Sequence, residues 1–113
     1  TNVKALYLGD SVQTAIDRMV QEDISQLPVI SKQGNILGIV SEGSVLQKGA
    51  HRTGLIEQVM ERNPAVVDVS LSVAEARRRL VEVEALLVTE QDLLVGLVTR
   101  MDLVNALRLR SIG

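Results

Sequence analysis

Two short segments of this chain place a second polar side chain three residues after a hydroxyl side chain. The sequence GLVTRMD places Asp102 three residues after Thr99, and GIVSEGS places Ser44 three residues after Ser41. This is the spacing of a capping box, in which the two side chains bond to backbone N–H groups at a helix start. The same geometry suits a ligand, because a helix N-terminus binds phosphate and a carboxylate accepts two hydrogen bonds from a ribose. Both interpretations remain open.

The two segments differ at their last residue. Ser44 can make one good hydrogen bond to a ribose where Asp102 makes two charge-assisted bonds, each about twice as strong. Glu42 directly follows Ser41 and points elsewhere on the helical turn, so it is a poor substitute for the missing carboxylate. We therefore expect one competent site and one weakened or altered site.

The segments that must position these residues occur twice. Residues 11–20 align with residues 72–81, and residues 28–41 align with residues 86–99 after a short deletion in the second copy. Each copy is predicted to contain a strand, a helix, two further strands and a second helix. The chain is thus expected to be an α/β (α+β) protein built from two related units.

Apolar spacing predicts the individual elements. A helical stripe with one packed face is expected for Val12, Ala15, Ile16, Met19, Val20 and, in the second copy, Val73, Ala76, Leu80. The second of these helices begins with an S-x-x-E capping box formed by Ser72 and Glu75. Strands are expected at 3–8 and 65–70, hairpins at 26–40 and 85–98, a helical turn at 55–60 and a last helix at 101–109.

The composition excludes several classes of function. The formal net charge is −2 and Tyr7 is the single aromatic residue, which argues against nucleic-acid binding by this region. No cysteine is present and no apolar run reaches the length of a membrane span, so a cytoplasmic protein without membrane contact is expected. We find no catalytic constellation and no metal-ligand pattern, and expect a binding protein, not an enzyme.

The duplicated pattern resembles the CBS domain, a module that occurs in tandem pairs called Bateman modules. The resemblance rests on ISQLPVI and GNILGIVSEGSVL in the first copy and on ALLVTEQDLLVGLVTRMDLVNAL in the second. It implies two repeats related by pseudo-two-fold symmetry, each a small sheet with two packed helices (β-α-β-β-α). We expect repeat 1 at residues 1–48, a linker and short helix at 49–60, and repeat 2 at 61–113.

The resemblance also implies a set of ligand contacts in the cleft between the repeats. In the family, the acid of one repeat faces the first strand and the hairpin of the other. Carried over by position, the main site comprises Thr99, Asp102, Lys4, Ala5, Ile24, Ser25 and Pro28. Arg100, inside the same turn, is a candidate contact for a phosphate. The second, weaker site comprises Ser41, Ser44, Ala65 and Val66.

The ligand that the resemblance implies contains adenosine: AMP, ADP, ATP or S-adenosylmethionine. The expected function is regulation of an attached domain or partner, in a homodimer that is part of a larger protein. The segments resemble the regulatory CBS pairs of cystathionine β-synthase-like enzymes and also those joined to helix-turn-helix transcriptional regulators, and the parent protein stays open. The alternative is a structural or dimerisation module whose nucleotide sites are vestigial, which Ser44 favours and Asp102 opposes.

Overall fold

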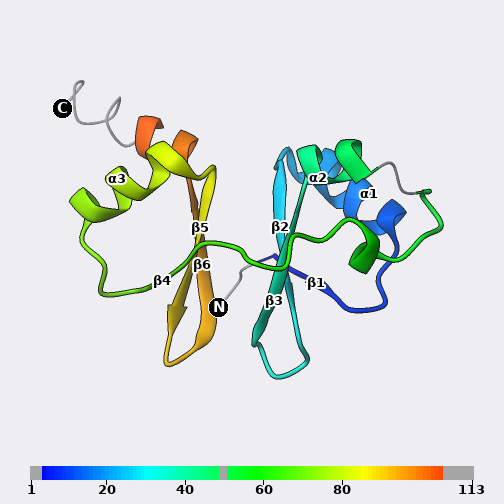
Figure 1. Cartoon of the computed structure of the whole chain (residues 1–113), viewed down its shortest axis with the longest axis horizontal. Coiled ribbons are helices and arrows are strands. Elements are labelled where there is room, and N and C mark those ends of the chain that lie inside the picture. Colours follow the sequence, from blue (N-terminus) through cyan, green and yellow to red (C-terminus); the bar gives the residue numbers. More distant parts are fainter. Residues whose placement is uncertain (1–3, 49–50, 106–113) are drawn as a thin grey trace. The chain divides into compact units, whose positions relative to one another are not determined.

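The computed structural model describes residues 4–48 and 51–105, which fall into two compact units that divide after Pro64 (Figure 1). Each unit contains its own three-stranded mixed sheet, and the strand orders, β1-β2-β3 and β4-β5-β6, correspond. The predicted duplication of an α/β unit is therefore confirmed. Parts of the predicted strand at 3–8, linker at 49–60 and helix at 101–109 lie outside the described residues.

The first unit follows the predicted element order. Its elements are β1 (Leu6–Tyr7), α1 (Val12–Glu22), β2 (Gln26–Ile30), β3 (Ile36–Ser41), α2 (Glu42–Lys48) and the short 3-10 helix η1 (Ile56–Gln58). Strand β2 is central: it pairs in parallel with β1 and antiparallel with β3. Helices α1 and α2 lie side by side and cover one face of this sheet (Figure 1).

The core of the first unit includes residues from the segment that follows α2. Nine buried apolar side chains form it: Leu6, Val12, Ala15, Leu27, Val29, Val40, Ile56, Val59 and Met60. The segment also pairs with β3, because Ile39 and Glu61 exchange two backbone hydrogen bonds of 2.9 and 2.8 Å. The residues around η1 are thus an integral part of this unit.

Helix α1 begins and ends at clear signals. The Ser11 hydroxyl accepts a 3.0 Å hydrogen bond from the Thr14 N–H, and Asp23 ends the helix in the left-handed conformation with φ 53°. The predicted stripe is confirmed except at Val20, which is 75% exposed. Val20 stands at the edge of the stripe, rotated by about 80° from Val12 at 3.6 residues per turn, so it misses the packed face.

The second unit repeats the arrangement. Its elements are β4 (Val66–Asp68), α3 (Val73–Glu82), β5 (Ala85–Glu90), β6 (Leu93–Thr99) and a helical segment at residues 100–105. Strand β5 pairs in parallel with β4 and antiparallel with β6. The β5–β6 hairpin turns on Gln91 and Asp92, whose φ angles of 52° and 65° are those of a two-residue type I′ turn.

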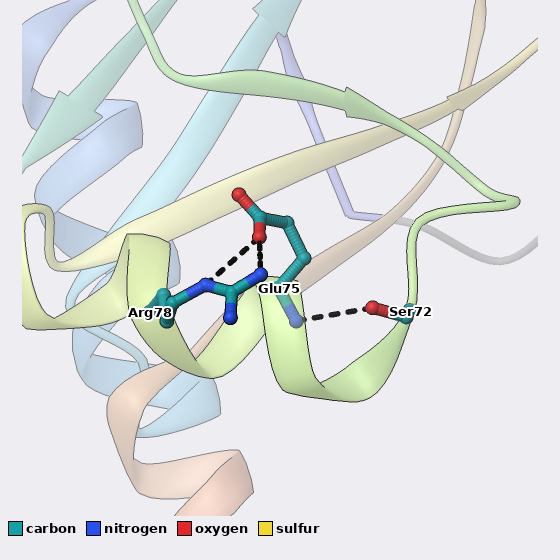
Figure 2. Close-up of polar contacts among 3 residues, drawn as sticks. All are labelled: Ser72, Glu75 and Arg78. Carbon is teal, nitrogen blue, oxygen red and sulfur yellow. Dashed lines mark hydrogen bonds and ion pairs between the residues drawn. The ribbon is translucent and has the colours of Figure 1, made fainter.

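Helix α3 has the predicted cap in part. The Ser72 hydroxyl accepts a 3.1 Å hydrogen bond from the Glu75 N–H (Figure 2). The Glu75 carboxylate does not return to Ser72, as a full capping box requires, and instead pairs with Arg78 one turn later. The packed face is Ala76 and Leu80, whereas Val73, in the first turn, is 59% exposed and was wrongly assigned to it.

Candidate functional site

The Thr99–Asp102 turn closes a reciprocal set of hydrogen bonds at the end of β6. Asp102 Oδ2 accepts from the Thr99 N–H at 2.7 Å and from the Thr99 hydroxyl at 3.1 Å. The Asp102 N–H in turn donates to Thr99 Oγ1 at 3.3 Å. The side chain of Asp102 is exposed, and within residues 4–48 and 51–105 its second oxygen, Oδ1, has no hydrogen-bond partner. The carboxylate therefore caps the helix and keeps one oxygen available.

The Ser41–Ser44 turn uses the same bonds with a serine in place of the acid. The Ser44 N–H donates to Ser41 Oγ at 3.0 Å, and Ser44 Oγ accepts from the Ser41 N–H at 2.9 Å. The Ser44 hydroxyl also donates to the Ser41 carbonyl oxygen at 3.0 Å. Ser44 is only 1% exposed. Its hydroxyl is thus engaged within its own turn, which distinguishes it from Asp102.

Arg100 contacts the C-terminal end of α3. Its Nε donates to the Leu80 carbonyl oxygen at 2.6 Å, and its Nη2 donates to the Val81 carbonyl oxygen at 3.2 Å. A cation at these last-turn carbonyls satisfies acceptors that the helix leaves open and complements the helix dipole. In this structure Arg100 thus joins the start of the 100–105 helical segment to the C-terminus of α3.

Three of the residues expected to contact the ligand lie together in the first unit. Lys4 and Ala5 directly precede β1, Ile24 lies between α1 and β2, and all three line one pocket of about 370 Å³. Lys4 forms an ion pair with Glu22, which lines the same pocket. The Ala5 carbonyl oxygen accepts a 2.5 Å hydrogen bond from Arg18 Nη1. The pocket therefore combines apolar surface with charged groups.

Five lining residues were not in the predicted set: Tyr7, Arg18, Gln21, Glu22 and Leu27. Three of them, Arg18, Gln21 and Glu22, stand three and four residues apart on α1. Residues with that spacing share one face of a helix, so the sequence held a signal for them. The spacing alone does not indicate a pocket, because the polar face of a helix usually faces solvent.

The remaining predicted contacts lie elsewhere. Ser25 is exposed and its carbonyl oxygen accepts a 3.0 Å hydrogen bond from the Glu42 N–H, whereas Pro28 is fully buried in β2. Neither lines the pocket of the first unit. In the second unit, Ala65 accepts a 2.9 Å hydrogen bond from the Leu87 N–H and Val66 is 42% exposed in β4.

Two carboxylates of the second unit have lowered pKa values, and both lie outside the predicted sites. The Ser70 hydroxyl and N–H donate to Asp68 at 2.6 and 2.9 Å, which lowers the pKa of Asp68. The hydrogen bond and charge of Arg78 lower the pKa of Glu75 (Figure 2). These hydrogen bonds stabilise the ionised forms within local turns.

The described residues offer no cluster of His, Asp or Glu side chains that could hold a metal ion. Across 4–48 and 51–105, no helix has the length and apolar character needed to cross a membrane. What the structure does offer is a duplicated α/β unit, two equivalent capped turns and a pocket with charged and apolar walls.

These features are those of a tandem repeat of one α/β unit, and the comparisons with known proteins agree. The CBS domain family matches residues 1–51 and 56–109. The chain belongs to this family and is a tandem CBS pair, or Bateman module.

Individual relatives extend the comparison. The uncharacterized protein YtoI of Bacillus subtilis is 30% identical over 111 residues, which make up 94% of this chain and 25% of YtoI. The chain spans about a quarter of the length of the curated relatives it matches.

Two solved structures show the same fold. CBSX2, solved in complex with AMP, is 26% identical with a TM-score of 0.84, covering 96% of this chain and 90% of CBSX2. The CBS domain pair of protein MJ0100, solved with 5′-methylthioadenosine and S-adenosyl-L-methionine, has a TM-score of 0.86 and covers 97% of this chain and 91% of that pair. At 18% identity this second likeness concerns the fold alone.

Proposed function

We propose that the chain is a regulatory module of a larger protein and that it binds an adenosine-containing ligand, namely AMP, ADP, ATP or S-adenosylmethionine. Binding controls an attached domain or partner. One observation carries the proposal: Lys4, Ala5 and Ile24, expected contacts from separate chain segments, line a single pocket. The AMP complex of CBSX2 supports the choice of ligand.

The chemistry of the pocket suits an adenine base. Ala5, Ile24 and Leu27 provide aliphatic surface and Tyr7 adds an aromatic ring, and both kinds of surface suit the faces of a base. For Asp102 of the second unit we propose a contact with a ribose hydroxyl through Oδ1, while Oδ2 keeps its bonds to Thr99. Capping and ligand binding are therefore compatible in this turn.

The Ser41–Ser44 turn is expected to contribute less to ligand binding than the Thr99–Asp102 turn. The Ser44 hydroxyl already donates and accepts within the turn, so a ribose gains little from it. We assign this turn, with Ala65 and Val66, to a second site that is weaker than the first or unused. The stoichiometry of binding, one ligand per chain and not two, measures this directly.

Isothermal titration calorimetry of the folded chain with each of the four ligands tests the proposal. At least one ligand should bind with a measurable enthalpy and raise the melting temperature by mass action. If the folded chain binds none of them at millimolar concentration, the proposal is wrong.

A second candidate function is dimerisation without ligand, which exposed apolar side chains on the helices favour. Val20 on α1 and Leu46 on α2 are 75% and 80% exposed, and Val81 on α3 is 77% exposed. Within the first unit α1 and α2 contact each other, and apolar groups exposed on two adjoining helices favour a protein contact there. We propose a homodimer in either case, which sedimentation equilibrium tests, and the calorimetric titrations separate a sensor from a purely structural module.

A further inference from the structure

The pocket of the first unit is lined by more positive than negative side chains. Its charged lining residues are Lys4, Arg18 and Glu22. Lys4 and Glu22 form an ion pair, so their charges offset one another. Two cations and one anion leave a formal charge of +1, and this excess charge belongs to Arg18.

Arg18 is held in place by the backbone. Its Nη1 donates to the Ala5 carbonyl oxygen at 2.5 Å, which links α1 to the start of β1. A guanidinium has five N–H donors, and within 4–48 and 51–105 the hydrogen bond to Ala5 is the one that Arg18 makes. The other donors remain available to a ligand. A planar, fixed guanidinium matches the oxygens of a phosphate better than a flexible ammonium does.

We infer that this pocket selects an adenosine ligand that carries phosphate and that Arg18 determines this specificity. The inference rests on the proposed function and narrows its four ligands to the nucleotides. S-adenosylmethionine carries a sulfonium and an ammonium against one carboxylate, so its net charge has the same sign as the pocket. Uncharged adenosine gains nothing from Arg18. AMP places a doubly charged phosphate against it.

The test compares three ligands on the full chain by calorimetry at low ionic strength. AMP should bind about tenfold more tightly than adenosine or S-adenosylmethionine, because one charge-assisted contact contributes about that factor. In Arg18→Gln the affinity for AMP should fall to within about twofold of that for adenosine, while the affinity for adenosine stays unchanged. Arg18→Lys keeps the charge and should retain part of the preference.

Two further variants give the test its controls. Arg77→Gln removes an exposed arginine of α3 in the other unit and should leave all three affinities unchanged. Glu22→Gln removes the negative charge from the pocket and should strengthen AMP binding, opposite in direction to Arg18→Gln. The preference for AMP should also weaken as salt is added, because screening reduces it. Melting temperatures identify any variant that is not folded.

The outcomes separate the inference from the function on which it rests. If none of the adenosine ligands binds, both are wrong. If adenosine or S-adenosylmethionine binds as tightly as AMP, or if Arg18→Gln leaves the preference for AMP intact, the function stands and the inference is overturned. A weaker affinity for AMP in Glu22→Gln also overturns it.

Discussion

Replacing Gly38 by alanine should destabilise the first unit. Gly38 lies in β3 where the chain returns to pair with Ile39, so its α-carbon stands against residues 60 and 61. A Cβ at this position would lie 2.5 Å from the Glu61 carbonyl oxygen and 2.5 Å from Met60 Cγ. The Met60 side chain can move, but the Glu61 carbonyl cannot retreat without loosening its 2.9 Å hydrogen bond to the Ile39 N–H.

The chain contains a matched control at the corresponding residue of the second unit. A Cβ on Gly96 would meet only Val88 Cβ at 3.8 Å, an ordinary van der Waals contact. Overpacking of the kind expected at Gly38 costs about 1–3 kcal/mol, whereas a glycine-to-alanine change in open space stabilises by about 0.4–1 kcal/mol through the unfolded chain. Gly38→Ala should therefore be the less stable variant by at least about 1 kcal/mol.

Chemical denaturation of the two full-length variants, followed by circular dichroism, measures the difference. In thermal melts each kcal/mol corresponds to about 4–8 °C for a unit of this size. Equal stability of Gly38→Ala and Gly96→Ala, to within about 0.5 kcal/mol, would refute the reasoning. It would mean that residues 60 and 61 do not lie as close to Gly38 in β3 as the distances above require.

The other predictions concern single side chains. Ser72→Ala should lower the free energy of unfolding by about 1 kcal/mol in urea titrations, because the Glu75 N–H loses its cap. The pKa of Glu75 lies below its ordinary value of 4.5, so its ionised form stabilises the fold at higher pH, and this contribution is lost as the pH falls through the lowered pKa. Glu75→Gln should therefore flatten the pH dependence of the free energy of unfolding below about pH 4.5. An acid unfolding profile unchanged in the variant would exclude this role. Asp102→Ala should weaken adenosine-ligand binding at least about tenfold in calorimetry, whereas a purely capping role lowers only stability, by about 0.5–2 kcal/mol. Leu46→Lys should shift a homodimer towards monomer in sedimentation runs while changing monomer stability by less than about 0.5 kcal/mol, since Leu46 is 80% exposed.

The sequence alone predicts the repeated fold, because both the duplication and the periodic spacing of apolar residues can be read directly along the chain. The predicted hairpins, the first helix and the helical turn at 55–60 all lie where expected. The return of the chain to β3 was not foreseen, although Ile56, Val59 and Met60 have the spacing of one helical face. The pairing between Ile39 and Glu61 is a tertiary contact, and local sequence patterns do not predict such contacts.

In the candidate site, too, the sequence predicts some residues, whereas others depend on tertiary packing. The resemblance to CBS domains brought out Lys4, Ala5 and Ile24, which line one pocket, but it did not indicate Arg18 or Glu22. The spacing of Arg18 and Glu22 on α1 places them on one helix face, but only the tertiary contact between Arg18 and Ala5 brings that face to the pocket. Whether Asp102 contacts a ligand stays a prediction, since its hydrogen bonds to Thr99 satisfy the capping role by themselves.

The burial of Ser44 makes the difference between the two turns hard to reverse. Asp102 is exposed, and water solvates whatever part of its charge the turn leaves over. Position 44 is 1% exposed, so a carboxylate introduced there would pay a desolvation penalty of several kcal/mol or take up a proton. A Ser44→Asp substitution therefore cannot place an ionised carboxylate in this turn without opening the packing around it.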